Sequence, residues 1–496
     1  MTTPGTSKAT GAGTPGAARG LAGLALFLLA LTLTGPVPAA AQATDEDKRV
    51  EYENGGVYEG DFKGGRQHGR GNYTLPSGFR YSGEWVDGRI QGRGVADYAN
   101  GDSYEGDFVN GEPHGFGRIA FADGGTYEGD WRNGAITGKG LATYANGVVY
   151  EGGFLNSRHH GTGVLRNPNG FVYEGGWVNG LREGWGKITY ADGSVYEGAL
   201  RGGVNHGTGA LITPDGLHYD GNWVEGAMEG TGRLIQPGGD VYEGDFASGR
   251  RHGRGRAVYA NGDVYEGGFR EDRRHGEGIL TYAEGGSYSG QWVSGRQEGA
   301  GRRVYPDGAV YEGTFAGDLA DGTGRITYPD GSVYEGEWKA GVIEGSGITR
   351  YASGIVYTGR FRNGRNHGHG RITYPGGFRY EGEWVEGVRE GTGTTTYVDG
   401  SVYTGEHRNG NPHGRGEISM PDGFRYSGDW RNGEIHGQGV VVYANGDVYE
   451  GGFAHNTRQG MGVMRYATGE TDEGRWEGGV LSGGGDDGGD APEEAE

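Results

Sequence analysis

A unit of 23 residues recurs from Tyr58 onward without insertion or deletion, and this repeat constrains the fold more than any other feature. Its first residue is tyrosine in eighteen successive copies, from Tyr58 to Tyr449, and the next register holds Asp472. Counting from each tyrosine as position 0, glycine stands at +2, +11, +13 and +20 in these copies. Because units in such an array contact mainly their neighbours, the repeat predicts one extended structure rather than several globular domains.

Each unit shows the alternation of two β-strands joined by short turns. Within residues 332–357, Tyr334 and Trp338 alternate with Glu335 and Glu337, as on a strand with one apolar and one polar face. Asn-Gly and Asp-Gly pairs between such strands indicate hairpin turns. Short connections force successive strands to be antiparallel neighbours. The sequence therefore predicts an all-β fold, an elongated single-layer antiparallel meander of about 18 consecutive hairpins without a helix.

The composition follows from this architecture. The 496 residues include 114 Gly, 32 Tyr, 15 Phe and 10 Trp but no Cys. Collagen needs glycine at every third residue, and disordered chains are poor in aromatic residues, so both are excluded. A one-layer sheet has no second layer to cover its apolar face. We therefore expect rings at 0, +4 and +17 to lie over glycines of neighbouring strands, where no Cβ obstructs them.

The same rings are the candidate interaction surface. In one interpretation they are only the covering of the sheet itself, and in the other they form a face for self-association, protein docking or glycan stacking. The residues of this candidate face are Tyr81, Trp85, Tyr127, Trp131, Tyr173, Trp177, Tyr334, Trp338, Tyr380, Trp384, Tyr426 and Trp430. Leu200 and His407 interrupt the aromatic column at +4.

No residue pattern predicts catalysis, a metal site or a cofactor. Nine histidines occupy +10, but alternate units lie about 19 Å apart, too far to share one ion, and we interpret them as turn residues bonded to backbone. Carboxylates at +1 and +3 face arginines such as Arg70 and Arg93, which indicates cross-strand ion pairs. The Gly-x-Gly elements lack the βαβ context of a phosphate loop. We therefore predict a protein that is not an enzyme.

The ends of the chain differ from the repeats. Residues 1–43 have a basic start, an apolar run over 21–33 and the motif Ala-Gln-Ala, which predicts a signal peptide cleaved between Ala43 and Thr44. An uncleaved inner-membrane anchor is the alternative. Residues 44–51 form a polar lead-in, and residues 478–496 are predicted to be a disordered, acidic, Gly-rich tail. Together with the absence of Cys, these features predict a periplasmic or secreted bacterial protein.

The repeat resembles the membrane occupation and recognition nexus (MORN) family. Tyr104-Glu105-Gly106-Asp107-Phe108, with His114-Gly115 and Gly117, carries the family's pattern, and the resemblance covers residues 52–477. It implies an extended sheet used for protein binding, scaffolding or self-association. We therefore expect a non-enzymatic scaffold of the bacterial cell envelope with unknown envelope proteins as partners. The alternative is a glycan- or membrane-lipid-binding module that uses the aromatic face. A net charge of −21 disfavours nucleic acid and anionic lipid.

Overall fold

The computed structural model describes residues 44, 45 and 48–482, and the chain divides into two units, residues 1–260 and 261–496. The predicted signal peptide lies outside the described residues. Within each unit every strand pairs antiparallel with the strands that precede and follow it in the chain, which confirms the predicted all-β meander. The described part of the chain contains no helix of the length and apolarity that a membrane span requires.

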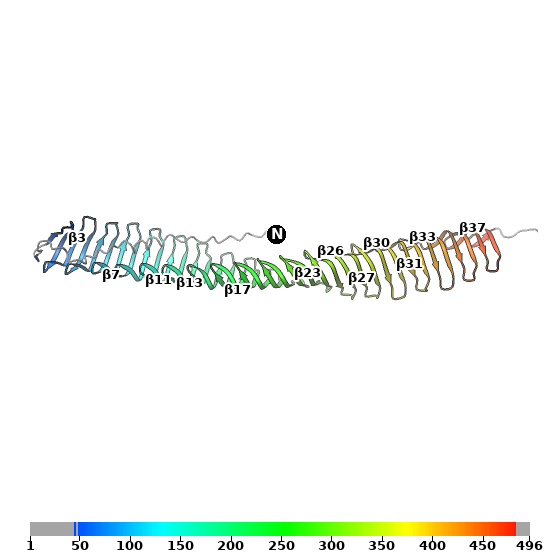
Figure 1. Ribbon diagram of the computed structural model, residues 1–496, viewed down its shortest axis with the longest axis horizontal. Helices are drawn as coiled ribbons and strands as arrows, with labels where there is room; N and C mark the ends of the chain where they lie inside the picture. The colour runs from blue at the N-terminus through cyan, green and yellow to red at the C-terminus, as the bar shows by residue number, and fades with distance from the viewer. Residues whose placement is uncertain (1–43, 46–47, 483–496) are drawn as a thin grey trace, which may run out of the picture. The chain divides into compact units, whose positions relative to one another are not determined.

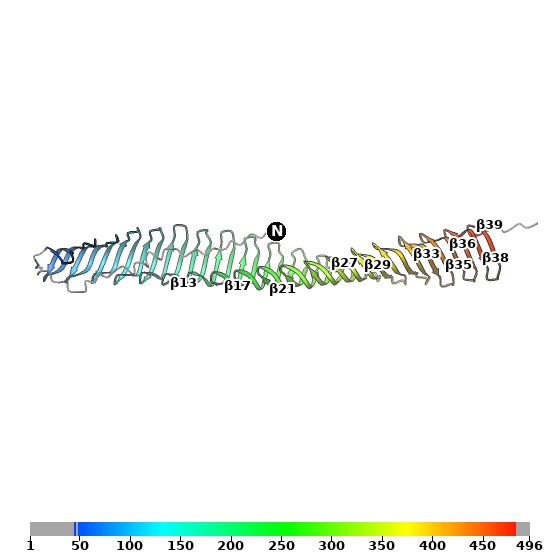
Figure 2. The ribbon, with the colours of Figure 1, turned by 45° about the horizontal axis from the view of Figure 1, so that its top comes forward.

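The first unit is a single row of strands, coloured blue to green in Figure 1 and seen from a second side in Figure 2. Its strands are β1 (Arg49–Glu51), β2 (Val57–Lys63), β3 (Arg66–Thr74), β4 (Arg80–Val86), β5 (Arg89–Asp97), β6 (Ser103–Val109), β7 (Glu112–Ala120), β8 (Thr126–Arg132), β9 (Ala135–Thr143), β10 (Val149–Leu155), β11 (Arg158–Arg166), β12 (Val172–Val178), β13 (Leu181–Thr189), β14 (Val195–Arg201), β15 (Val204–Ile212), β16 (His218–Val224), β17 (Ala227–Ile235), β18 (Val241–Ala247) and β19 (Arg250–Val258).

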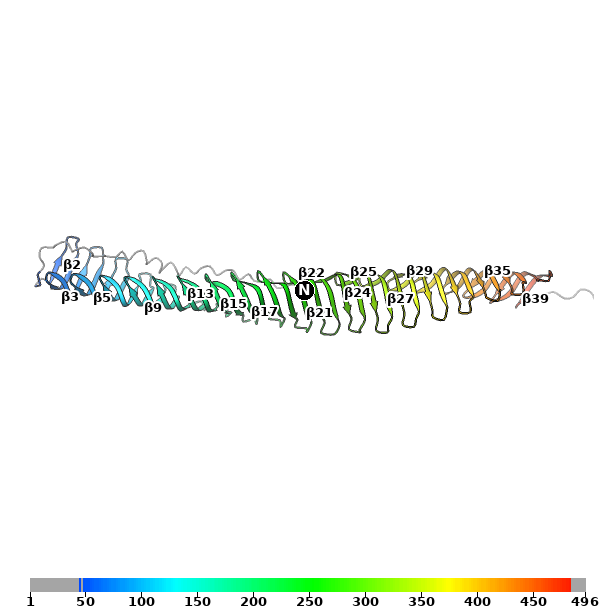
Figure 3. The same cartoon turned by 60° about the horizontal axis from the view of Figure 1, so that its bottom comes forward.

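The second unit repeats the arrangement, and Figure 3 shows its strands from β21 to β39 as one layer. Its strands are β20 (Val264–Arg270), β21 (Arg273–Thr281), β22 (Ser287–Val293), β23 (Arg296–Val304), β24 (Val310–Ala316), β25 (Leu319–Thr327), β26 (Val333–Lys339), β27 (Val342–Arg350), β28 (Val356–Arg362), β29 (Arg365–Thr373), β30 (Arg379–Val385), β31 (Val388–Thr396), β32 (Val402–Arg408), β33 (Asn411–Ser419), β34 (Arg425–Arg431), β35 (Glu434–Val442), β36 (Val448–Ala454), β37 (Thr457–Arg465), β38 (Thr471–Glu477) and β39 (Val480–Ser482).

Short strands at the two ends extend the array beyond its predicted limits. The segment 44–51, predicted as a polar lead-in, contains β1, which pairs with β2 and places Arg49 Nε 3.0 Å from a carboxylate oxygen of Glu59. At the other end β39 pairs with β38, so residues 480–482 are not part of a disordered tail. Both additions give hydrogen-bond partners to a strand edge that would otherwise be exposed. Residues 483–496 of the predicted tail lie outside the described residues.

A continuous row of glycines crosses each sheet beneath the tyrosine rings. In the hairpin of β28 and β29, Gly359 pairs with Gly370, and the Tyr357 ring lies directly over both. A Cβ added to Gly370 would stand 2.2 Å from the Tyr357 hydroxyl oxygen. Tyr357 is fully buried, and its hydroxyl donates a 2.9 Å hydrogen bond to the carbonyl of Arg360. The tyrosine ring at position 0 therefore packs on the bare backbone of the glycines at +2 and +13, as predicted.

The rings at +17 do not follow that expectation. In β27 the strand ends at Arg350, and Tyr351 begins the next turn with 41% of its surface exposed. The Tyr351 amide donates to the carbonyl of Ile355, and the Gly354 amide donates to the carbonyl of Tyr351. The ring at this position therefore flanks a loop and does not cover the glycine row.

A bulge bends the hairpin of each of the eighteen copies near the glycine at +11. Between the pairs Gly336–Gly347 and Trp338–Ile343, one strand has a single residue and the other has three. Gly345, the +11 residue in that stretch, has φ +78°, a left-handed conformation that glycine adopts without a Cβ penalty. The two-residue turn that follows the first strand is left-handed as well, as at Asn110 (φ 54°) and Gly111 (φ 85°).

Candidate functional site

The twelve candidate interaction residues all lie in the interior of their sheets. Each has at most 8% of its surface exposed, and the six tyrosines have at most 1%. Trp338 illustrates the packing, since its ring meets the rings of Tyr311 and Tyr334 edge to face, with centroids 5.1 and 5.6 Å away. The rings therefore cover their own hairpins, and a partner would reach them only if the hairpins opened.

Hydrogen bonds fix these rings to the backbone. Trp338 Nε1 donates to the carbonyl of Gly324 in the preceding hairpin at 3.3 Å, and Trp384 donates to Gly370 in the same way at 3.0 Å. The Tyr380 hydroxyl donates to the carbonyl of Glu383 at 2.8 Å. Burial raises the pKa of Tyr380 to about 12, so this hydroxyl stays protonated and remains a donor at neutral pH. Each aromatic side chain thus has a fixed structural partner.

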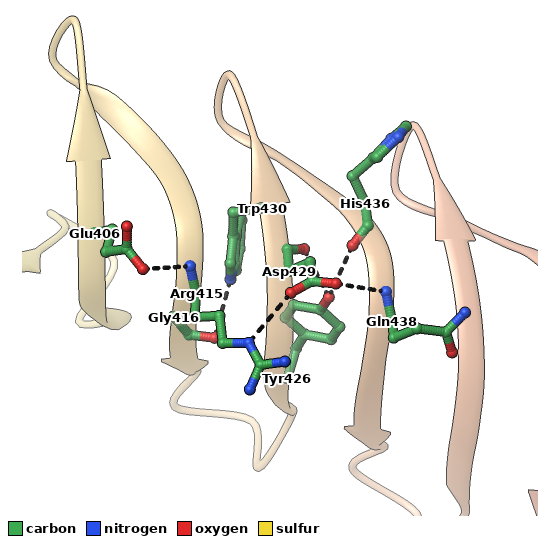
Figure 4. Close-up of polar contacts among 8 residues, drawn as sticks. All are labelled: Glu406, Arg415, Gly416, Tyr426, Asp429, Trp430, His436 and Gln438. Carbon is green, nitrogen blue, oxygen red and sulfur yellow. Dashed lines mark hydrogen bonds and ion pairs between the residues drawn. The ribbon is translucent and has the colours of Figure 1, made fainter.

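The carboxylates at +3 hold the bulge on the opposite, polar face. Asp429 Oδ2 accepts the amide of Gln438 at 2.9 Å, and its Oδ1 lies 3.6 Å from Arg415 Nε on the preceding strand (Figure 4). Glu406 accepts the amide of Arg415 at 3.1 Å in the same manner. The predicted cross-strand ion pairs are present, for example at Arg93 and Asp107 (3.8 Å), and their exposure makes them weak. The hydrogen bond from each carboxylate to a backbone amide therefore contributes more to stability than the ion pair does.

A groove follows the polar face of the second unit. It has a volume of about 930 Å³, and its walls carry the carboxylates of Glu417, Asp429, Glu450 and Glu473 around a floor of glycines. Met461, which is 66% exposed, adds an apolar surface to it. The complete lining is Thr404, Arg415, Gly416, Glu417, Ser427, Gly428, Asp429, Gln438, Gly439, Val440, Glu450, Gly451, Met461, Gly462, Val463 and Glu473.

Several side chains at +10 connect their hairpin to the next turn, whereas Nδ1 of His68, His160 and His367 has no hydrogen-bond partner among the described residues. His114 Nδ1 accepts the amide of Asn133 at 3.5 Å, and His413 accepts that of Asn432 at 3.4 Å, which confirms the predicted bonding of these two histidines to backbone. Glu390, also at +10, accepts the amide of Asn409 at 3.0 Å. Within the described residues no three His, Asp or Glu side chains gather closely enough to hold a metal ion.

Buried His407 and half-buried His159 pack against the rings and were not predicted as part of the core. His407 replaces the +4 ring and bonds to the Thr395 hydroxyl through Nε2 at 3.0 Å. His159 stacks on Tyr150 at 3.6 Å and bonds to the Tyr144 hydroxyl at 2.7 Å. Burial lowers the pKa of each imidazole to about 4, so both are neutral at pH 7. The sequence indicates a buried histidine at His407, because it interrupts the aromatic column at +4, whereas no sequence feature indicates it for His159.

The family model that matches this chain is the MORN repeat. It matches residues 58–80, 81–103, 104–126, 127–149, 150–172, 173–195, 219–241, 242–264, 265–287, 288–310, 311–333, 334–356, 357–379, 380–402, 403–425, 426–448 and 449–471. The copy at 196–218, in which Leu200 stands at +4, is not matched, although β14 and β15 form there as in the other copies. Such an array of matched units is a repeat scaffold.

Comparison with solved structures gives weak likenesses, and comparison with curated proteins gives no match. The TCP10 domain of Danio rerio CPAP, solved with a peptide of Danio rerio STIL, is 16% identical with a TM-score of 0.24, over 48% of this chain and 94% of that one. The TCP domain of Drosophila melanogaster SAS-4, solved with a proline-rich motif of Ana2, is 14% identical with a TM-score of 0.21, over 35% and 86%. Virginiamycin B lyase from Staphylococcus aureus is 13% identical with a TM-score of 0.11, over 56% and 90%. Likenesses of this size say nothing about function.

Proposed function

Because this chain belongs to the MORN repeat family, we propose that it is a non-enzymatic scaffold that binds protein partners on the polar face of its hairpins. One observation supports the proposal: the strand pairing repeats from copy to copy, while the outward side chains differ. Arg415, Gln438 and Met461 occupy the same +12 position on successive hairpins of identical pairing. A constant frame with a variable surface is the arrangement that repeat proteins use for selective binding.

The groove of the second unit is the strongest candidate for this contact. Of its four carboxylates, Asp429 lies 3.6 Å from Arg415 and Glu450 lies 3.3 Å from Arg465, so Glu417 and Glu473 leave the groove a net negative charge. Met461 and Val463 supply apolar area between the carboxylates. This combination favours a basic polypeptide segment that carries an apolar side chain, since charge steers the encounter and buried apolar area supplies affinity. A binding role for the twelve buried rings would require the hairpins to open, so the proposal does not use them.

We place the scaffold in the bacterial cell envelope, exported to the periplasm or secreted. The support is the predicted signal peptide at 1–43 and the absence of Cys, which leaves stability to packing alone. Self-association is a further form of the same role, with a second copy as the partner. Fractionation of cells that express the full chain tests this placement, and recovery only in the cytosol would contradict it.

The binding role is tested by crosslinking capture from the envelope with the full chain and two matched variants. Met461→Arg adds a cation to the groove, and Ile279→Arg adds the same charge at an exposed position of β21 in the same unit, outside the groove. We expect the partners captured by the unmodified chain to be lost with Met461→Arg and kept with Ile279→Arg. Equal capture by both variants would refute the groove, and no specific capture by any chain would refute the scaffold.

A further inference from the structure

Trp185 is the exception among the tryptophans. The other nine occupy +4, are at most 8% exposed and donate Nε1–H to a glycine carbonyl. Trp185 stands at +12 on the polar face of β13 and is 61% exposed. Neighbouring copies place Thr162 and Thr208 at +12, so the backbone does not require an indole there. An exposed ring of this size that serves no packing role is a candidate contact for a ligand.

The row of +3 and +12 residues that contains Trp185 carries no charge between β10 and β15. Position +3 carries a carboxylate in the first four copies but is Gly153, Gly176 and Ala199 in three consecutive hairpins. Ala199 pairs directly with Trp185, and Gly176 pairs with Thr162. The result is an uncharged strip across β10 to β15, formed by Gly153, Thr162, Gly176, Trp185, Ala199 and Thr208. Small neighbours leave the ring open on both sides.

Hydrogen-bonding groups flank the ring at regular distances. Thr162 and Thr208 are exposed and lie two strands to either side of Trp185, about 10 Å away at the usual strand spacing. Beside the strip, Lys187 lies across from Glu174 on one side and from Glu197 on the other, so this row offers two carboxylates as acceptors and an ammonium group as a donor.

We propose that this uncharged strip binds a neutral glycan chain, with one sugar stacked on the Trp185 indole. The C–H face of a sugar ring packs flat on an indole, and its hydroxyl groups bond to the threonine hydroxyls, carboxylates and ammonium group beside it. A protein hot spot needs further large apolar side chains, which glycine, alanine and threonine do not provide. An uncharged row under a single exposed ring, with hydroxyl, carboxylate and ammonium groups beside it, therefore fits a neutral, hydroxyl-rich ligand.

Affinity electrophoresis of the full chain tests the proposal, in gels that contain hydroxyethylcellulose, xylan or glycol chitin. Trp185→Thr installs the residue that neighbouring copies carry and preserves the fold. The matched control is Phe116→Thr, which removes another +12 ring, 54% exposed, that pairs with the charged Asp130. We expect retardation in at least one gel, weakened about tenfold or more by Trp185→Thr and unchanged by Phe116→Thr.

Tryptophan fluorescence provides an independent readout, because Trp185 is the only well-exposed tryptophan in the described part of the chain. Iodide should quench one component of the emission, cellotetraose or chitotetraose should protect it, and Trp185→Thr should remove it. The proposal fails if no gel retards the unmodified chain, if Trp185→Thr binds as well as the unmodified chain, or if Phe116→Thr loses binding equally. It also fails if Trp185→Thr abolishes capture of a protein while no gel retards the chain, since the strip is then a protein-docking site.

Discussion

Replacing Gly370 by alanine tests whether the glycine row exists to make room for the tyrosine rings. The new Cβ would stand 2.2 Å from the Tyr357 hydroxyl oxygen and 2.6 Å from Cζ, where ordinary contacts begin near 3.4 Å. Tyr357 has no free space to retreat, because its ring meets Phe361 and Trp384 with centroids 5.0 and 5.5 Å away. The backbone at Gly370 is not left-handed, so the effect measured is steric crowding alone.

The expected cost is the sum of small known contributions. Overpacking of a tight core costs about 1–3 kcal/mol. Displacing the ring weakens the hydroxyl bond to Arg360, worth about 1 kcal/mol, and two edge-to-face contacts worth about 0.5–1.5 kcal/mol each if fully lost. Removing a glycine from the unfolded chain returns about 0.4–1 kcal/mol. With the ring only partly displaced, we expect β28 and β29 to lose about 2–4 kcal/mol.

Hydrogen exchange followed by mass spectrometry is the appropriate assay, because a repeat array loses stability locally. A loss of about 2–4 kcal/mol accelerates exchange in β28 and β29 by roughly 30-fold to 1,000-fold, since about 1.4 kcal/mol corresponds to a factor of ten. The control is Gly376→Ala, six residues later, where an added Cβ meets no atom within 4 Å. Less than about threefold acceleration by Gly370→Ala, or equal effects of the two variants, would refute the packing argument.

The same assay checks three further predictions. Burial lowers the pKa of His407 to about 4 in the folded chain, so between about pH 6.5 and pH 4 the unfolded chain binds one more proton than the folded chain. Protection of β32 and β33 from exchange should therefore fall as the pH drops through this range. The double substitution His407→Phe with Thr395→Val should remove this pH dependence. Trp384→Phe deletes one indole bond and keeps a ring native to this column, so β29 and β30 should lose about 1 kcal/mol, and no loss would contradict the role of that bond. Asp429→Ala should cost about 1 kcal/mol in β35 because a backbone amide loses its acceptor, whereas Arg415→Ala should change stability by less than about 0.5 kcal/mol; the reverse order would contradict the assignment.

The sequence predicts the hairpins, their order and the ring core because these depend on local alternation and a fixed register. Tyr357 and Gly370 illustrate this, since a large ring and a missing Cβ recur at constant spacing. The bulge at +11 is not predicted, although its glycine is just as regular. In the sequence, a glycine that leaves room for a ring cannot be told from a glycine that adopts a left-handed φ. The strand pairing on both sides of Gly345 shows that this glycine belongs to the second kind.

The candidate site is less accessible to prediction from sequence. Glu390 and His413 both stand at +10 and both accept a backbone amide from the next turn. They are different residue types, and the only property they have in common is an atom with a lone pair. The groove is formed by side chains from several successive hairpins, which the alternation within one copy does not encode. Trp185 is the exception that the sequence does reveal, as the only tryptophan of the chain outside +4.

Burial of the rings determines where selectivity in this protein resides. A ring such as Trp338 that packs on two tyrosines and donates to a carbonyl cannot also serve a partner without loss of its hairpin. The outward +12 positions have no such constraint, because changing +12 from Arg415 to Met461 leaves the pairing intact. One backbone can therefore carry an acidic groove in one unit and the uncharged strip around Trp185 in the other. Substitutions at +12 should accordingly change binding specificity alone, while stability should follow the rings, the glycines and the carboxylates that accept backbone amides.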